Sequence, residues 1–168
     1  MALTGPQKIT LKAYIDSVPA LASQPLVGEG PSNVAAVLNL DASPVFWVWR
    51  TFVPDAEIYE VTTEDATSWS WTSFIGRSQG ERDAWRQMVN MKGGINAALA
   101  NVRAGISDIF SGAGGSAQRT HLLTIGRRKA RQVEKVLATG TGSTASPATM
   151  GYEGPITPDE VADARNNG

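Results

Sequence analysis

The chain has no cysteine and only one histidine, His121, among its 168 residues. Without cysteine it has no disulfide bonds, no thiolate metal ligands and no cysteine nucleophile. His121 is followed by two leucines, a setting typical of a packed or surface histidine rather than a catalytic one. These absences argue against an enzyme, and we expect neither a resident metal nor an organic cofactor.

Long hydrophobic runs and a strong net charge are also lacking. No apolar run approaches the ~20 residues that a membrane-spanning helix needs. Residues 1–12 do not contain the apolar stretch of a secretory signal peptide. We therefore expect no membrane contact, and synthesis in the cytoplasm. The formal net charge of −1 argues against general nucleic-acid binding, but it leaves room for a local basic patch.

The glycine-rich segment 112–115 precedes a predicted helix, as a phosphate-binding loop would. The lysine and the serine or threonine that such a loop requires do not follow it, so we expect a turn between two helices. Acidic pairs such as Glu81 and Asp83 stand at predicted helix starts, where the helix dipole accounts for them without catalysis. None of these segments indicates an enzymatic function.

Capping signals and apolar periodicity predict a mainly α-helical chain. Residues 8–18 place their apolar side chains at helical spacing. Ser78 with Glu81, and Thr157 with Glu160, each form the pattern of a capping box, in which two side chains satisfy the free N–H groups at a helix start. The expected fold is a small helical bundle with extended N- and C-terminal arms.

Two segments leave the choice between helix and strand open. Residues 45–52 favour a helix because Ser43-Pro44 provides a cap and then a proline at the first helical position. The same run is rich in aromatic and β-branched residues, so a buried strand is the alternative. Within residues 57–75, a short β-hairpin around 64–66 competes with a helix that begins near Trp71. We favour the helix in both segments.

The longest predicted helix covers residues 117–138. Its apolar residues fall in one broad arc, and four cationic residues fall in a separate arc. These four are Arg127, Arg128, Arg131 and Lys135. An ordinary solvated helix face accounts for them, and so does a surface that faces DNA phosphates or an acidic partner.

The composition of the chain changes after Gly140. Residues 141–149 are small, polar and uncharged, and they cannot bury enough apolar surface to fold alone. A capped short helix follows them. We therefore expect a helical domain over 1–140 and a flexible C-terminal arm over 141–168. Three apolar residues of this arm are expected to bury against a neighbouring subunit or partner: Tyr152, Ile156 and Val161.

All five tryptophans lie between residues 47 and 85. Large aromatic side chains contribute most to packing, so the largest part of the core is expected in this region. Trp85 follows a capping box and has apolar neighbours, which predicts that it is buried. A chain of this size can hardly hide five tryptophans, so we expect at least one of them at an interface.

Four strings of the chain resemble small neck proteins of tailed bacteriophages. They are residues 43–50 (SPVFWVWR), 78–88 (SQGERDAWRQM), 101–112 (NVRAGISDIFSG) and 134–150, which ends in ATM and is followed by YEG at 152–154. The resemblance implies a head–tail adaptor, a ring of twelve copies beneath the portal and around the DNA channel. Its implied partners are the portal protein, tail or neck proteins, further copies of itself and, without sequence specificity, the packaged DNA. The implied location is the virion neck, and the host cytoplasm during assembly.

Other functions compete with the adaptor. A tail terminator or another neck component would also be structural. A small DNA-binding protein would use the cationic residues between 127 and 135. An enzyme ranks last, because neither the residues nor the resemblance supplies a catalytic group.

Overall fold

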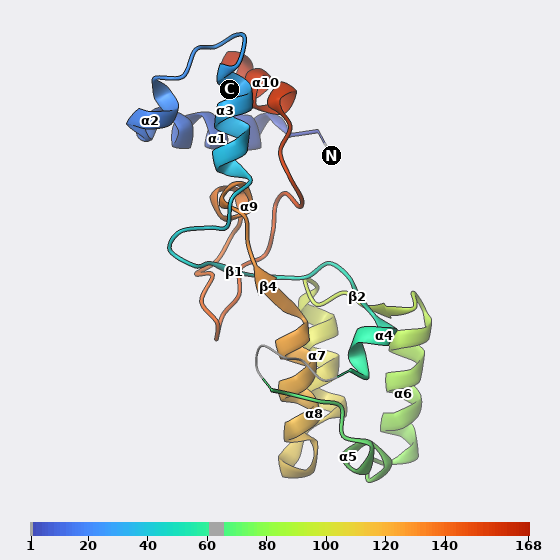
Figure 1. Cartoon of the computed structure of the whole chain (residues 1–168). Helices are drawn as coiled ribbons and strands as arrows, with labels where there is room; N and C mark the ends of the chain where they lie inside the picture. The colour runs from blue at the N-terminus through green and yellow to red at the C-terminus, as the bar shows by residue number, and fades with distance from the viewer. Residues whose placement is uncertain (1, 61–65) are drawn as a thin grey trace. The chain divides into compact units, whose positions relative to one another are not determined.

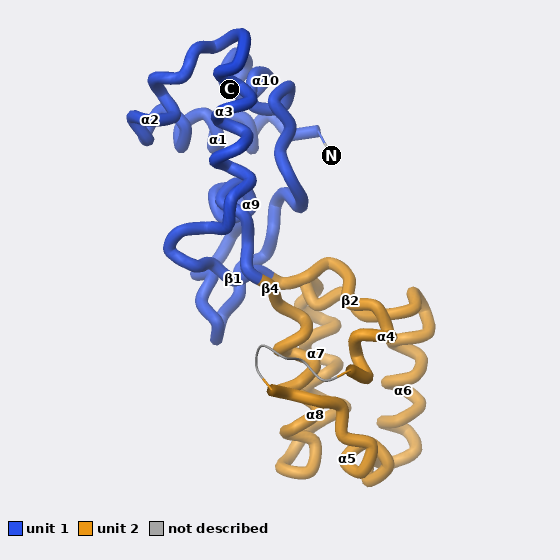
Figure 2. Tube along the Cα trace, viewed as in Figure 1, with its two compact units in different colours: residues 1–48, 129–168 blue, residues 49–128 orange. Residues whose placement is uncertain are grey.

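The computed structural model describes residues 2–60 and 66–168. Within these residues the chain forms ten helices and two antiparallel sheets of two strands each (Figure 1). The mainly helical class predicted from the sequence is thus confirmed. The chain divides into two compact units (Figure 2). Unit 1 comprises residues 1–48 and 129–168, and unit 2 comprises residues 49–128.

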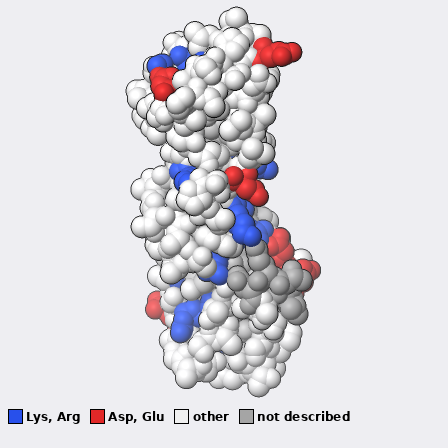
Figure 3. Space-filling view, turned by 60° about the vertical axis from the view of Figure 1, so that its left-hand side comes forward, with Lys and Arg blue, Asp and Glu red and all other residues white. Residues whose placement is uncertain are grey.

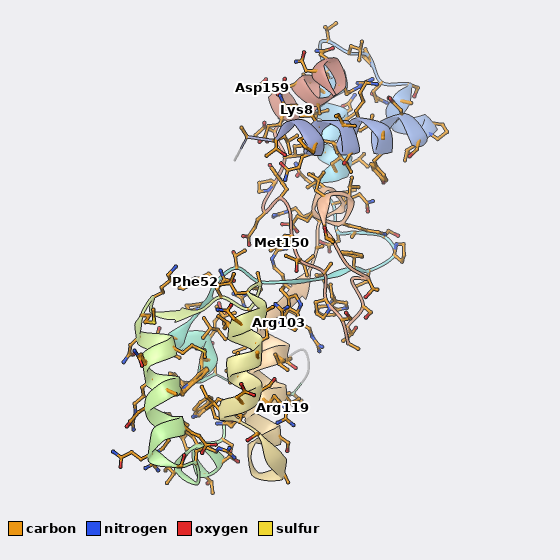
Figure 4. The ribbon with its side chains drawn as sticks, turned by 180° about the vertical axis from the view of Figure 1, so that it is seen from behind. Lys8, Phe52, Arg103, Arg119, Met150 and Asp159 are labelled. Atoms are coloured by element: carbon orange, nitrogen blue, oxygen red, sulfur yellow. The ribbon has the colours of Figure 1, made fainter. Side chains whose placement is uncertain are left out.

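Unit 1 is built on helices from both ends of the chain. Helix α1 packs against α2, α9 and α10, and α3 packs against α9 and α10. Figure 4 shows Lys8 on α1 and Asp159 on α10, two neighbouring helices of this unit. The helices are α1 (Gly5–Ser17), α2 (Pro19–Ala22), α3 (Gly30–Leu38), α9 (Gln132–Leu137) and α10 (Pro158–Asn167).

The C-terminal segment belongs to the core of unit 1. The expectation that residues 141–168 form a flexible arm apart from the helical domain is therefore wrong. Tyr152, Ile156 and Val161 are buried in one cluster with apolar residues of α1, α3 and α9. Ile156 and Asn39 exchange two hydrogen bonds, from the Ile156 N–H to Asn39 Oδ1 (2.7 Å) and from Asn39 Nδ2 to the Ile156 carbonyl oxygen (2.9 Å). The three residues expected to contact a neighbour therefore stabilise their own unit.

Unit 2 encloses a core rich in aromatic residues. Trp85 is 1% exposed and packs with Trp69 and Phe110, which confirms its predicted burial. Strand β2 (Val53–Pro54) pairs with β3 (Gly94–Ile95) in antiparallel register, with Val53 opposite Ile95. The helices are α4 (Asp55–Ile58), α5 (Trp71–Ile75), α6 (Gln79–Asn90), α7 (Ala100–Ile109) and α8 (Gly112–Ile125).

Strands replace two of the predicted helices. The helix expected over 117–138 is wrong, because α8 ends at Ile125, β4 (Arg127–Lys129) follows, and α9 begins only at Gln132. The helix favoured over 45–52 is also wrong, because this segment forms β1 (Trp47–Trp49). The two strands pair with each other. A pairing partner some 80 residues away in the sequence therefore outweighs the local helical pattern.

Of the two alternatives for residues 57–75, the helix is found at the C-terminal end, where Trp71–Ile75 forms α5. Ser70 caps this helix by accepting a hydrogen bond from the Ser73 N–H. The turn of the alternative hairpin falls at 64–66, and of these only Ala66 is among the described residues. Both predicted capping boxes are confirmed, Ser78 with Glu81 at α6 and Thr157 with Glu160 at α10.

Candidate interaction surfaces

The four cationic residues do not share one helix face. Arg127 and Arg128 lie on β4, Arg131 precedes α9, and Lys135 lies on α9. All four are half-buried. Lys135 Nζ donates to the carbonyl oxygens of Ser43 (3.0 Å) and Pro44 (3.3 Å), so this ammonium group stabilises its own unit. The continuous cationic face expected from the sequence is therefore wrong.

Acidic groups accompany the basic ones on the surface. Figure 3 shows one face on which lysine and arginine atoms lie beside aspartate and glutamate atoms in several places. Lys8 and Asp163 form such a pair at 2.7 Å, and the Lys8 ammonium lowers the pKa of the Asp163 carboxyl through its hydrogen bond. Mixed charge of this kind suits contacts with proteins better than a uniform attraction to DNA.

An apolar groove opens on unit 2 between α6 and α7, next to β3. Its volume is about 440 Å³. The apolar side chains of Met91 and Leu99 are exposed at this groove, although apolar side chains are usually buried. Its lining consists of Ala84, Gln87, Met88, Met91, Lys92, Gly94, Ile95, Asn96, Leu99, Asn101 and Val102. We call this surface the α6–α7 groove.

One close backbone approach and one arginine side chain hold the segments around the α6–α7 groove in place. A Cβ atom on Gly94 would lie 2.2 Å from the Val53 carbonyl oxygen, so only glycine allows β3 to approach β2 this closely. Arg103 on α7 (Figure 4) donates to the carbonyl oxygens of Ala97 (2.6 Å) and Ala98 (2.9 Å). Its guanidinium also lies 4.6 Å from the ring centroid of Trp49, and burial lowers the pKa of Arg103. The segment that leads into α7 is therefore held in place.

Unit 1 presents an apolar loop between α2 and α3. Leu26 and Val27 are exposed at its tip, and Val27 is 77% exposed. Buried Arg165 on α10 donates to the carbonyl oxygens of Gln24 (2.7 Å) and Pro25 (3.0 Å) at the base of the loop. We call residues 23–29 the Leu26–Val27 loop. Its base is fixed by a buried cation, whereas its apolar tip points away from the core.

A second aromatic feature of unit 2 reaches the surface. Tyr59 and Trp71 stack with ring centroids 5.4 Å apart and an interplanar angle of 12°. Trp71 is 56% exposed, whereas Trp69, which contacts both rings, is buried. The expectation that at least one tryptophan lies at an interface stays a prediction, and Trp71 is its candidate.

His121 is buried and occupied by structural contacts. Its Nε2 lies 2.8 Å from the Ile58 carbonyl oxygen, and its Nδ1 lies 3.1 Å from the Thr67 hydroxyl. Gln118, also on α8, bonds both the N–H and the carbonyl group of Ser70. These two side chains tie α8 to the segment before α5, and neither is available to a substrate.

Residues 76–80 match the Gly-x-Ser-x-Gly pattern of a nucleophile elbow. Such an elbow joins a strand to a helix, whereas this segment joins α5 to α6. Ser78 Oγ accepts from the Glu81 N–H (3.3 Å) and donates to Glu81 Oε2 (2.7 Å). The motif is thus a helix cap, and its serine is paired with the capping carboxylate.

Across residues 2–60 and 66–168, no group of three or more histidine, aspartate or glutamate side chains could hold a metal ion. No helix in the same part of the chain is long and apolar enough to cross a membrane. Sequence reasoning also missed the Leu26–Val27 loop, whose signal is a pair of aliphatic residues between Pro25 and Gly28. Comparison of the chain with protein-family models, curated proteins and solved structures gives no match.

Proposed function

We propose that this chain is a structural assembly protein, a head–tail adaptor that forms a ring between the portal and the tail of a bacteriophage. The supporting observation is that each unit presents an exposed apolar surface on a fixed frame. These surfaces are the Leu26–Val27 loop of unit 1 and the α6–α7 groove of unit 2. Exposed apolar surface of this kind is a mark of protein–protein contact. The resemblance of four sequence strings to phage neck proteins supports a location between the portal and the tail.

The packaged DNA is a secondary partner in this proposal. Arg127, Arg128 and Arg131 are the side chains that would face phosphates or an acidic surface of the portal. Contacts of arginine with phosphate carry no sequence information, which suits DNA that moves through a channel. Lys135 contributes less, because its ammonium group already binds two carbonyl oxygens of unit 1.

An amber stop codon placed in the gene for this chain, in the genome of the phage that carries it, tests the proposal by removing the protein. Electron microscopy of the lysate should show DNA-filled heads without tails, together with free tails. Purified protein added to this lysate should restore joined particles. Joined particles with tails of irregular length would indicate a tail terminator instead. Normal virions in the absence of the chain, or a gene outside any phage or prophage, would overturn the proposal.

A further inference from the structure

We propose that the Leu26–Val27 loop of one copy binds in the α6–α7 groove of a second copy. The inference rests on the proposed function, because a ring of identical subunits needs one contact that repeats between neighbours. The loop and the groove are different surfaces, so each copy can give a loop to one neighbour and receive a loop from the other. Such a head-to-tail contact closes into a ring when the rotation between copies allows it.

The two surfaces match in size and chemistry. The loop offers two adjacent aliphatic side chains, and the groove of about 440 Å³ is in the range that holds a few such groups. Met88 and Met91 line the groove, and the flexible thioether side chain of methionine adapts to the shape of an apolar partner. Leu26 and Val27 would exchange water for these apolar contacts.

Hydrogen bonds hold the base of the loop in place. Arg165 holds the carbonyl oxygens of Gln24 and Pro25, and Asn33 Nδ2 donates to Gln24 Oε1 at 3.1 Å. A Cβ atom on Gly30 would lie 1.8 Å from the Pro25 carbonyl oxygen, so glycine lets the end of the loop close against its base. A segment with fixed ends loses little conformational freedom on binding, which favours association.

Opposite charges accompany the two surfaces. Glu29 ends the loop and is exposed, and Lys92 lines the groove and is exposed. Neither side chain has an ion-pair partner among the residues that the structure describes. When the loop enters the groove of a neighbour, the two charges can pair across the contact. This complementarity favours a second copy over an unrelated apolar peptide.

Complementation between two variants tests the contact. Val27→Glu damages only the loop, and Met91→Glu damages only the groove. Both side chains are largely exposed, at 77% and 75%, so both variants should fold. In sedimentation velocity runs, the wild type should form oligomers as concentration rises, and each variant alone should stay monomeric. An equimolar mixture should form dimers and nothing larger, because it holds one intact loop and one intact groove per pair.

Matched controls come from exposed apolar residues outside both surfaces. Ile9 in unit 1 is 61% exposed and Ile75 in unit 2 is 65% exposed. Ile9→Glu and Ile75→Glu should associate like the wild type. A wild type that is monomeric at every concentration would overturn the proposal. So would a mixture of the loop and groove variants that stays monomeric.

Cysteine cross-linking provides a second readout, because the natural chain contains no cysteine. With an added oxidant, Val27→Cys mixed with Met91→Cys should give disulfide-linked dimers, and Ile9→Cys mixed with Met91→Cys should give few. A double variant that cross-links only within one chain would show that the loop fills its own groove, and the proposal would fail. Neither assay involves the portal or the tail, so these results are independent of the amber-codon test.

Discussion

Replacement of Trp85 by alanine would remove a fully buried side chain from the core of unit 2. Its ring centroid lies 5.3 Å from that of Phe110 and 5.6 Å from that of Trp69. The Trp85 indole N–H has no hydrogen-bond partner among the described residues, so the substitution removes packing alone and orphans no acceptor. Large-to-small aromatic substitutions in cores cost about 3–5 kcal/mol. We expect Trp85→Ala to lower the free energy of unfolding of unit 2 by this amount.

Native-state hydrogen exchange measures this effect within each unit. A loss of about 3–5 kcal/mol corresponds to exchange that is faster by roughly two to four powers of ten for the amides that open with the core. The amides of α7 and α8 report on the aromatic core of unit 2. The amides of α3, in unit 1, serve as the internal reference.

Two further substitutions sharpen the test of Trp85. Trp85→Phe keeps an aromatic ring in the core and should cost less than Trp85→Ala, because it leaves a smaller cavity. Trp71→Ala removes a tryptophan that is 56% exposed, so its cost should be smaller than that of Trp85→Ala. Unchanged protection of α7 and α8 in Trp85→Ala would refute the reasoning, because it would mean that this side chain does not hold the core together.

The remaining predictions concern one titration, one close approach and one charged segment. Burial and a neighbouring carboxylate raise the pKa of Tyr152 to about 12. Because the folded chain keeps this phenol proton at a pH at which the unfolded chain has lost it, the stability of unit 1 should fall as pH rises from about 10 to 12. Tyr152→Phe should reduce that fall in urea titrations, and equal pH dependence of the two proteins would contradict the assignment. Gly94→Ala should cost about 1–3 kcal/mol in thermal melts, because its Cβ would lie 2.2 Å from a carbonyl oxygen of β2. Gly80→Ala, with nothing within 4 Å, is the matched control, and equal melts would refute the clash. The charge reversal Arg128→Glu with Arg131→Glu should leave the fold intact but prevent the joining of heads to tails, and full infectivity would reduce these arginines to ordinary surface residues.

Local signals in the sequence were sufficient for the features that depend on local physics. The capping boxes at Ser78 and Thr157 use side chains three residues apart, so their geometry needs no partner from elsewhere in the chain. The apolar spacing of residues 8–18 likewise predicts α1. The burial of Trp85 is predicted by its position after a capping box and by its apolar neighbours in the same helix. The mainly helical class follows from the sum of such signals.

Local sequence patterns did not predict the pairing of segments that are far apart in the sequence. Residues 117–138 carry a helical pattern, yet the Ala130 N–H donates to the Phe46 carbonyl oxygen at 2.8 Å beside the pairing of β1 and β4. The polar segment after Gly140 looked unable to fold, yet the Thr139 and Thr149 N–H groups each donate to the other residue's carbonyl oxygen at 2.9 Å. In both places the hydrogen-bond partner lies outside the few consecutive residues from which periodicity and composition predict structure.

By itself the sequence determined the helical class, the helix starts at Ser78 and Thr157 and the burial of Trp85, because capping and amphipathic spacing are properties of a few consecutive residues. Only the tertiary structure decided that the C-terminal segment completes the core of unit 1. It also separated the cations near residue 130 into different elements, because residues 127–129 form strand β4 paired with β1, and the helix on either side of them is interrupted. The α6–α7 groove and the fixed base of the Leu26–Val27 loop likewise arise from contacts between distant segments, such as Arg165 with Pro25. Such contacts exist only once the chain has folded, and they carry both proposals for its function.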